Sequence, residues 1–300
     1  MQYLVDALSL GSLYALGALG IALIFGVMRL VNFAHGSIIA CCVFSLIVPS
    51  VEAQAQLLAG RLPDWVLVPA VLAVGAGLSV VSEFVVFRRL RQANPATMMI
   101  ASFALGFTIQ NVLLLLYSSR PKSLDLWSQL GQSVELWGAR IPFLQLITIG
   151  VGLLTLSALS FLLKHTRVGI EMRAAAEDFT MARMLGVRAN AVITLTFAIS
   201  GALAAAIALL LVSQTGVADI RMGLPIMLVA FIATVIGGLG SLAGSVAAGF
   251  LLGAVTVLLQ VVLPLDARTF RDAFLYLGVI AVLVWRPQGL LASPTTVSRI

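Results

Sequence analysis

The sequence has very little charge. Aspartate, glutamate, lysine and arginine make up 10% of the 300 residues, whereas 61% are hydrophobic and the mean hydropathy is +1.10. Soluble domains carry about 25% charged residues, so this chain has too little polar surface to stay in water. The composition therefore excludes a soluble globular protein and indicates an integral membrane protein.

The sequence also lacks the common motifs that bind nucleotides or metals. It contains no GxxxxGK[ST] and no Gly-Lys pair, so it cannot cradle and hydrolyse ATP by itself, and it contains neither HExxH nor CxxC. Its only two cysteines, Cys41 and Cys42, are adjacent in an apolar stretch, where small core residues are more common than a disulfide or metal ligands. We therefore expect no enzymatic activity, no cofactor and no metal site.

Apolar runs of about 20 residues are the main feature that is present. This length suits helices that cross a lipid bilayer, whereas the strands of an outer-membrane barrel need only about 10 residues. The sequence predicts an all-α polytopic membrane protein, a bundle of about eight or nine transmembrane helices in a single transmembrane domain over residues 1–300. The apolar segments are 4–27, 33–50, 65–87, 97–117, 141–163, 191–213, 225–240, 244–263 and 273–286.

Basic residues are divided unequally between the two sides of this bundle. If the spans alternate, one side holds eleven of the 18 basic residues and four acidic residues, a net charge of +7, and the other side has a net charge of −1. The positive-inside bias makes the +7 side cytoplasmic, together with the C-terminus. The overall charge of +6 is therefore a topology signal, and no basic soluble face is expected that would bind nucleic acid.

A long polar stretch, Arg167–Asn190, separates two apolar segments within a loop of about residues 164–190 that lies on the cytoplasmic side. Its alanine-rich centre favours one helix, Gly186 is placed for a left-handed C-cap, and Asn190 is placed to cap the next helix. A charged helix between membrane spans suits contact with a soluble motor, and the alternative is an amphipathic helix on the bilayer surface. The apolar stripe of this helix consists of Met181, Ala182, Met184 and Leu185.

Two segments are expected to be broken or re-entrant, near 31–37 and 237–244. The first places Asn32 and His35 between apolar runs, and the second has four glycines in eight residues, each of which weakens a helix by roughly 0.8–1 kcal/mol relative to alanine. A break at membrane depth is tolerated only against protein or a water-filled path. For 31–37, a transport pathway and a cytoplasmic turn are both compatible with the residues. The candidate pathway residues are Asn32, Phe33, His35, Gly36, Gly237, Gly238, Gly240, Ser241 and Gly244.

Five segments of the sequence stand out together: MRLVNFAHGSIIA, RAAAEDFTMARMLGV, ITLTFAISGALAAAIALLL, GGLGSLAGSVAAGFLLG and FLYLGVIAVLVWRPQGLL. They span nearly the whole chain. In this order they resemble the segments of the branched-chain amino acid ABC-transporter permeases, specifically the first, LivH-like, of the two permeases.

This resemblance implies a subunit of an importer in the bacterial inner membrane. The subunit would form half of the pathway for branched-chain or other hydrophobic amino acids, with a second permease, two cytoplasmic ATPase subunits and a periplasmic binding protein as partners. Relatives in this family import urea or short amides. A self-contained channel or secondary carrier would instead need a dedicated intramembrane carboxylate or an inverted repeat. No inverted repeat is evident, and the one candidate carboxylate, Glu83, lies close enough to Arg88 and the interface to pair with it.

The resemblance also implies roles for the cytoplasmic loop and for the small residues. In the family the loop contacts the ATPase through an alanine-rich stretch and a glycine about ten residues later, which Ala175, Ala176 and Gly186 match. Rows of small residues at four-residue steps, such as Ala7, Gly11, Ala15 and Ser245, Gly249, Gly253, are expected in part at the interface with the second permease. The loop residues expected to couple to the ATPase are Arg173, Ala175, Ala176, Glu177, Asp178, Met181, Arg183, Met184, Leu185 and Gly186.

Overall fold

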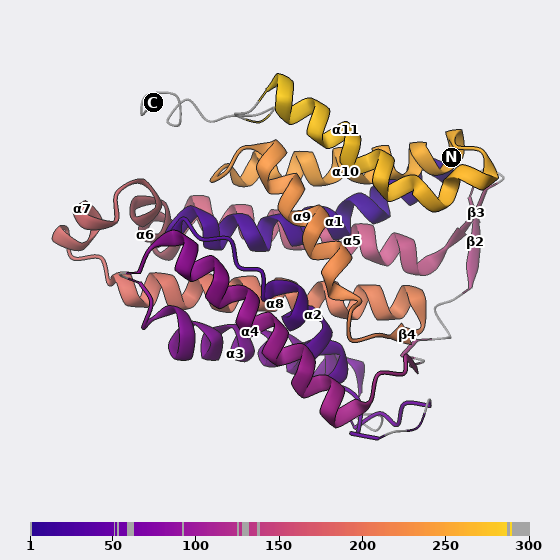
Figure 1. Ribbon diagram of the computed structural model, residues 1–300, viewed down its shortest axis with the longest axis horizontal. Helices are drawn as coiled ribbons and strands as arrows, with labels where there is room; N and C mark the ends of the chain where they lie inside the picture. The colour runs from indigo at the N-terminus through magenta and orange to yellow at the C-terminus, as the bar shows by residue number, and fades with distance from the viewer. Residues whose placement is uncertain are drawn as a thin grey trace. The chain divides into compact units, whose positions relative to one another are not determined.

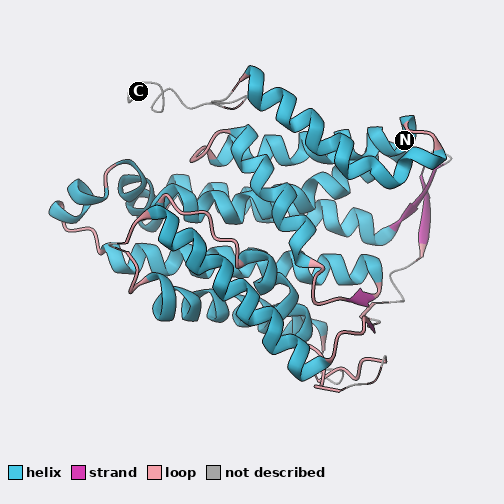
Figure 2. Ribbon diagram, in the orientation of Figure 1, coloured by secondary structure: helices cyan, strands magenta, loops and turns pink. Residues whose placement is uncertain are grey.

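The computed structural model describes residues 2–50, 52, 54–58, 63–91, 93–124, 126–127, 132–136, 139–286 and 289, and these are mostly helical (Figure 1). The short strands are β1 (Lys122–Ser123), β2 (Ser133–Leu136), β3 (Ala139–Pro142) and β4 (Val217–Ala218), drawn in magenta in Figure 2. The helices are α1 (Gln2–Met28), α2 (His35–Phe44), α3 (Asp64–Ser82), α4 (Pro95–Tyr117), α5 (Phe143–His165), α6 (Arg167–Glu177), α7 (Phe179–Met184), α8 (Ala189–Thr215), α9 (Gly223–Gly237), α10 (Leu242–Val262) and α11 (Arg271–Trp285). A π-helical segment, Glu83–Phe87, extends α3, and a 3₁₀ segment, Leu265–Phe270, precedes α11.

Six of the described helices are long and apolar enough to cross a membrane: α1, α4, α5, α8, α10, and α3 with its π-helical extension. The predicted segment 33–50 is helical only over the ten residues of α2. Ten residues rise about 15 Å, half of a hydrocarbon core of about 30 Å, so this segment is not a full helical span. The helix ends at Phe44, and the Ser45 hydroxyl bonds back to the Cys42 carbonyl at 2.6 Å.

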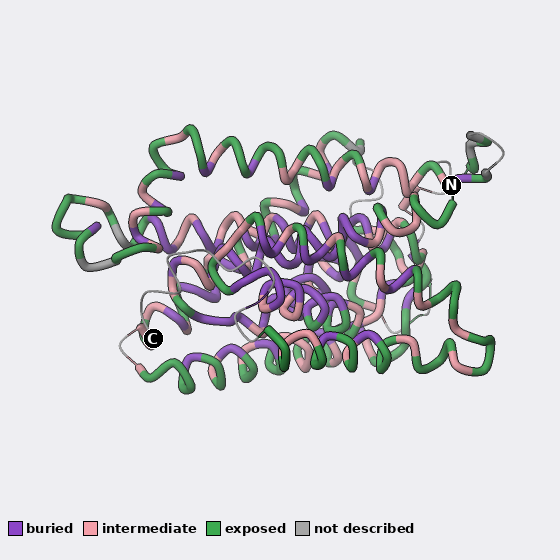
Figure 3. The backbone as a smooth tube through the Cα atoms, turned by 90° about the horizontal axis from the view of Figure 1, so that it is seen from above, coloured by how far each residue is buried: buried purple, intermediate pink, exposed green. Residues whose placement is uncertain are grey.

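Burial differs sharply between helices, and Figure 3 shows runs of buried residues on some of them and exposed residues along others. Nine of the ten residues of α2 are buried. By contrast, α4 exposes Ile100, Phe107 and Leu115, which are 69%, 70% and 87% accessible. A continuous apolar face of this kind is stable in lipid and prone to aggregation in water. The structure therefore agrees with the expected class, an all-α, multi-pass membrane protein.

The chain divides into two compact units. One consists of residues 1–22, 128–156 and 228–300, and the other of residues 23–127 and 157–227.

In the second unit, α3 packs along α8 at a close glycine contact. A Cβ atom placed on Gly75 would collide with the carbonyl oxygen of Gly201, and the reverse also holds. The same Cβ on Gly75 would lie 2.7 Å from the Cβ of Ala205. Phe87 and Phe197 close the contact further along, with ring centroids 5.3 Å apart. Helix α2 packs against α8, α4 and α3, which places the start of α2 among three helices.

A buried lysine links two loop segments of this unit through hydrogen bonds. Lys122 is 1% exposed, and its ammonium donates hydrogen bonds to the carbonyls of Ser50 at 2.6 Å and Glu52 at 2.8 Å. Its strand β1 pairs antiparallel with β4, Lys122 opposite Ala218. These bonds satisfy the charge of a cation that would otherwise be costly to bury.

In the first unit, the small-residue rows pack against each other. A Cβ atom on Gly249 of α10 would lie 2.6 Å from the Cα of Ala15 in α1, and one on Gly253 would collide with the Cα of Gly11. The Thr234 hydroxyl of α9 also donates to the Ala18 carbonyl of α1 at 3.1 Å. Gly11, Ala15, Gly249 and Gly253 therefore form a helix contact within the chain. The expectation that some of the small-residue rows lie at an interface with a second permease stays a prediction.

Candidate functional site

The first predicted break lies between α1 and α2. Helix α1 ends at Met28, Arg29 adopts a left-handed φ of 54°, and residues 29–34 are not helical. The Asn32 side-chain oxygen accepts a hydrogen bond from the Ala34 N–H at 3.1 Å, and the Asn32 carbonyl accepts one from the His35 N–H at 3.3 Å. The interruption predicted near 31–37 is confirmed, although the helix resumes at His35.

Helix α4 holds this break from one side. The Phe33 N–H donates to the Ser102 hydroxyl at 3.3 Å, and the Phe33 ring stacks on Phe103 with centroids 4.0 Å apart. Further along α4, a Cβ atom on Gly106 would lie 3.2 Å from the Ser37 hydroxyl. Helix α4 therefore touches both the irregular backbone and the first turn of α2.

The first turn of α2 is enclosed by α8 and α9. His35 is 1% exposed, and its Nδ1 lies 3.3 Å from the Ser200 hydroxyl of α8. A Cβ atom on Gly36 would lie 2.9 Å from the Gly223 carbonyl oxygen at the start of α9 and 3.1 Å from the Met227 Cβ. Any side chain at Gly36 would thus displace α9 or be displaced by it.

Two polar atoms at this break are buried without a partner among the described residues. They are Nδ2 of Asn32, a residue that is 1% exposed, and Nε2 of His35. A buried polar group without a partner costs about 1–3 kcal/mol and is rare in folded proteins, so each one needs an explanation. The side-chain oxygen of Asn32 stabilises the backbone turn, which fits the interpretation of this segment as a turn. Its amide N–H groups have no partner among the described residues, which is compatible with the interpretation as a transport pathway.

The second predicted break, 237–244, is also present, and it lies in the other unit. Helix α9 ends at Gly237, Gly238 and Gly240 have left-handed φ values of 95° and 94°, and α10 begins at Leu242. The Ser241 hydroxyl caps α10 by accepting a hydrogen bond from the Gly244 N–H at 3.1 Å. Gly237 and Gly244 pack backbone to backbone, so a Cβ atom on either would collide with the other. These glycines make a tight turn between two packed helices.

The prediction of one helix over the cytoplasmic loop is wrong. The structure has two helices, α6 and α7, separated at Asp178, whose backbone is extended with φ −146° and ψ 103°. The carboxylate of Asp178 accepts a hydrogen bond from the Met181 N–H at 3.0 Å, so Asp178 caps α7. Aspartate is a favoured N-cap, and this signal in the sequence was overlooked.

The end of α7 is as predicted. Gly186 has a left-handed φ of 88°, its N–H donates to the Arg183 carbonyl, and the Val187 N–H donates to the Ala182 carbonyl. This pair of bonds is a Schellman motif, which needs a residue that tolerates positive φ.

The predicted apolar stripe, Met181 to Leu185, has one buried and three exposed members at α7 and the residue that follows it. Ala182 is 3% exposed, whereas Met181, Met184 and Leu185 are 58%, 76% and 83% exposed. In α6, Ala175 is 2% exposed. Arg173, Glu177, Asp178 and Arg183 are all exposed, and Ala176 is half-buried.

A polar cluster that the sequence only partly predicted joins α3 to α8. Glu83 is fully buried, and Arg88 binds it at 3.1 Å, the pairing expected from its position. Arg91 and the Thr194 hydroxyl also bind the same carboxylate. Asn190 does not cap α8, which begins at Ala189; its side-chain oxygen instead accepts a hydrogen bond from Arg91.

The π-helical turn at Glu83–Phe87 sets the register of this cluster. The Arg88 N–H donates to the Glu83 carbonyl at 2.7 Å, a bond across five residues that leaves one extra residue in the turn. Glu83 and Arg88 were recognisable as a charged pair after an apolar run. The participation of Arg91, Asn190 and Thr194 has no local signal, because it depends on α8 returning beside α3.

Among the described residues no group of three or more potential metal ligands occurs.

Comparison with known proteins gives the family. Residues 3–283 match the model described as "Branched-chain amino acid transport system / permease component". The chain is 32% identical over 304 residues to the high-affinity branched-chain amino acid transport system permease protein BraD of Pseudomonas aeruginosa, covering 98% of this chain and 96% of that one. It is likewise 32% identical to LivH of Escherichia coli K12, with the same coverage.

A weaker likeness, 26% identity over 68% of this chain and 64% of the relative, connects it to the ribose import permease protein RbsC of Haemophilus influenzae. No solved structure matches the chain. The family consists of transport permease components, in agreement with the prediction that the chain is not an enzyme. The chain belongs to the branched-chain amino acid transport system permease family.

Proposed function

We propose that the chain is the membrane-spanning permease subunit of an ATP-binding-cassette importer, in which it forms half of the pathway for branched-chain or other hydrophobic amino acids. The observation that carries this proposal is its 31–32% identity to branched-chain amino acid permeases over 98% of its length. Within the family, import of urea or short amides is the alternative substrate class.

The break before α2 suits a pathway for an apolar amino acid. Asn32 and His35 each offer one buried polar atom without a partner among the described residues, and the surroundings are aromatic, glycine and aliphatic groups with three serine hydroxyls, those of Ser37, Ser102 and Ser200. Cargo handed over by a binding protein needs weak, transient contacts, since tight binding inside the membrane slows release. We propose that the Asn32 amide and His35 Nε2 contact the cargo or its gate, with His35 acting as a neutral hydrogen-bond partner. The glycine turn at Gly237–Gly244 is the second candidate part of this route.

The loop of α6 and α7 suits a coupling role. Three large apolar side chains, two on α7 and Leu185 directly after it, are more than half exposed beside exposed charged residues, an arrangement that favours docking into a groove of a soluble partner. We propose that Met181, Met184 and Leu185 enter a groove of an ATPase subunit. ATP would be hydrolysed by that subunit, because this chain carries no nucleotide-binding motif.

The proposed membrane topology rests on the lengths of the helices and on the distribution of basic residues. The six long helices, together with α2, α9 and α11, would make one transmembrane domain of eight or nine segments in the bacterial inner membrane. The positive-inside bias would place the 164–190 loop and the C-terminus in the cytoplasm. The partners would be a second permease, two ATPase subunits and a periplasmic binding protein.

The test is uptake of radiolabelled leucine, isoleucine and valine by cells that lack other carriers for these amino acids and express the complete system. Uptake of leucine that needs both this chain and the ATPase subunits is the expected result. Urea or acetamide, offered in excess, should leave leucine uptake unchanged. Leucine uptake in the absence of the ATPases would indicate a self-contained carrier, and uptake of urea without leucine would indicate the amide-importing class.

A further inference from the structure

The cluster around Glu83 holds more positive than negative charge. Two guanidinium groups, those of Arg88 and Arg91, share the one carboxylate of Glu83, which leaves a net charge of +1. Glu83 is 0% exposed, whereas the side chain of Arg88 is 36% exposed. The excess positive charge is therefore accessible at Arg88. A buried carboxylate needs one cation for neutrality, so the second arginine is not explained by charge balance alone.

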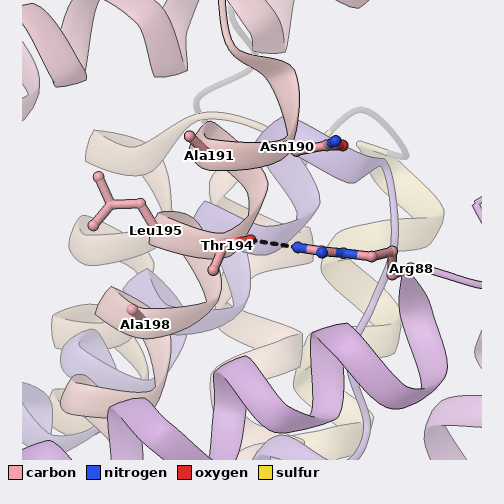
Figure 4. A pocket seen from close by; sticks show the side chains of 6 residues that line it. All are labelled: Arg88, Asn190, Ala191, Thr194, Leu195 and Ala198. Carbon is pink, nitrogen blue, oxygen red and sulfur yellow. Dashed lines mark hydrogen bonds between the residues drawn. The ribbon is translucent and has the colours of Figure 1, made fainter.

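A pocket lies directly beside this arginine (Figure 4). Its volume is about 500 Å³, and we call it the Arg88 pocket. Arg88 borders it on one side, and the first turns of α8 border it through Asn190, Ala191, Thr194, Leu195 and Ala198.

The lining changes in character along α8. In Figure 4, Asn190 and Ala191 lie at the first turn of the helix, Thr194 one turn on, where Arg88 reaches it, and Leu195 and Ala198 further along the helix. Asn190, Thr194 and the cation thus lie within the first two turns of α8, together with Ala191, and the aliphatic groups of Leu195 and Ala198 continue along the helix.

The polar end of the pocket is already arranged for an anion. The Arg88 guanidinium is fixed by Glu83 at 3.1 Å and by the Thr194 hydroxyl at 3.1 Å, so a ligand would not have to order it. The first turn of α8 has no side-chain cap, and the positive end of its dipole lies here. Arg88 also lies 4.8 Å above the centre of the Phe84 ring, which is 57% exposed and extends the apolar surface next to the cation.

We propose that the Arg88 pocket binds an anionic phospholipid. Its phosphate lies between Arg88 and the first turn of α8, and an acyl chain follows Leu195 and Ala198. The aliphatic half favours a lipid over free phosphate, which would leave that half unfilled. The orientation proposed above puts this end of α3 and α8 at the cytoplasmic leaflet, whose anionic lipids attract basic groups. The bound lipid would stabilise the region where α3 and α8 meet the loop of α6 and α7.

The test uses the full chain, purified with the subunits that accompany it, in nanodiscs of phosphatidylcholine with or without phosphatidylglycerol. Native mass spectrometry counts the retained phosphatidylglycerol. Ala191 is exposed at the mouth of the pocket and does not touch Glu83, so Ala191→Glu should repel the phosphate, while Ala191→Gln is its uncharged control. We expect about tenfold weaker retention in Ala191→Glu than in Ala191→Gln, the effect of one like charge at close range.

A second pair of variants removes the cation. Arg88→Gln should also lose about tenfold in retention, whereas Arg271→Gln should not, although Arg271 is likewise an ion-paired arginine with 33% side-chain exposure. Equal retention in Ala191→Glu and Ala191→Gln would overturn the proposal. Displacement of the lipid by millimolar inorganic phosphate would overturn the assignment to a lipid and leave an anion site. Lipid retention that appears only after the ATPase subunits are removed would overturn it in favour of a protein contact. Retention is read without transport, so its failure leaves the proposed import activity untouched.

Discussion

Two glycines of α3, two residues apart, should respond oppositely to the same substitution. Gly75 faces α8, where a new methyl group would lie 2.7 Å from the Ala205 Cβ and 3.0 Å from the Cys42 sulfur and would collide with the Gly201 carbonyl. Gly77 has nothing within 4 Å of the same position. Alanine improves helix propensity by about 0.8–1 kcal/mol at either site, so this contribution cancels between the two variants. The difference between them isolates the overpacking, about 1–3 kcal/mol.

Thermal unfolding of the purified chain with its accompanying subunits, followed by tryptophan fluorescence in the same nanodiscs, measures this difference. Gly77→Ala should melt at or slightly above the wild-type temperature, and Gly75→Ala several degrees below Gly77→Ala, since roughly 2–4 °C corresponds to 1 kcal/mol in domains of about 150–250 residues. Equal melting temperatures would refute the close packing of α3 on α8. A higher melting temperature for Gly75→Ala would show that the two helices are farther apart than described.

Three further substitutions test the candidate sites. Gly36→Val should reduce leucine import at least tenfold in an assembled complex, because its Cβ would lie 2.9 Å from a carbonyl oxygen of α9. Its control, Gly26→Val, should import normally, since no described atom lies within 4 Å of a Cβ at that position. Equal import by both variants would show that Gly36 is not part of the gate. Gly186→Val should destabilise the end of α7 by about 1–2 kcal/mol, because valine disfavours the left-handed φ of this residue. ATP hydrolysis and leucine import, measured together in proteoliposomes, should then become uncoupled. Normal coupling would favour the alternative in which this loop lies on the bilayer surface. Glu83→Gln should lower the free energy of unfolding by up to about 3 kcal/mol, a value reduced from that of a fully buried pair because Arg88 is partly exposed. Its control, Glu135→Gln, lies in an ion pair that is 69% and 79% exposed and should change the free energy of unfolding by less than about 1 kcal/mol. Equal effects would show that the Glu83 cluster is not buried in the membrane-embedded protein.

Local features were predicted well because their causes are local. The Schellman end at Gly186 follows from the conformational freedom of glycine, and the interruption at Gly238 and Gly240 follows from the same property. The break at Asp178 is equally local and was missed because the helix propensity of the neighbouring alanines was given more weight than the capping carboxylate.

Long-range partners could not be predicted, because no residue in the sequence names the helix that will lie beside it. Ala15 and Gly249 are small at helical spacing, which permits a close contact but leaves open whether the contact is within the chain or with another subunit. The same holds for Asn190, a plausible cap by its position, whose side chain is taken by Arg91 from 99 residues away.

The amino-acid sequence by itself determined that this protein lies in a membrane, where its six long apolar helices run, where two interruptions fall and which family it resembles, because hydropathy, glycine content and short motifs are properties of contiguous residues. Only the tertiary structure decided that Gly36 packs against α9, that Asn32 and His35 each have a buried polar atom with no partner in the described part of the chain, and that Glu83 is shared by two arginines next to a pocket. These facts depend on which distant segments meet, and the free energy of that meeting is a sum over many contacts that no single stretch of sequence contains.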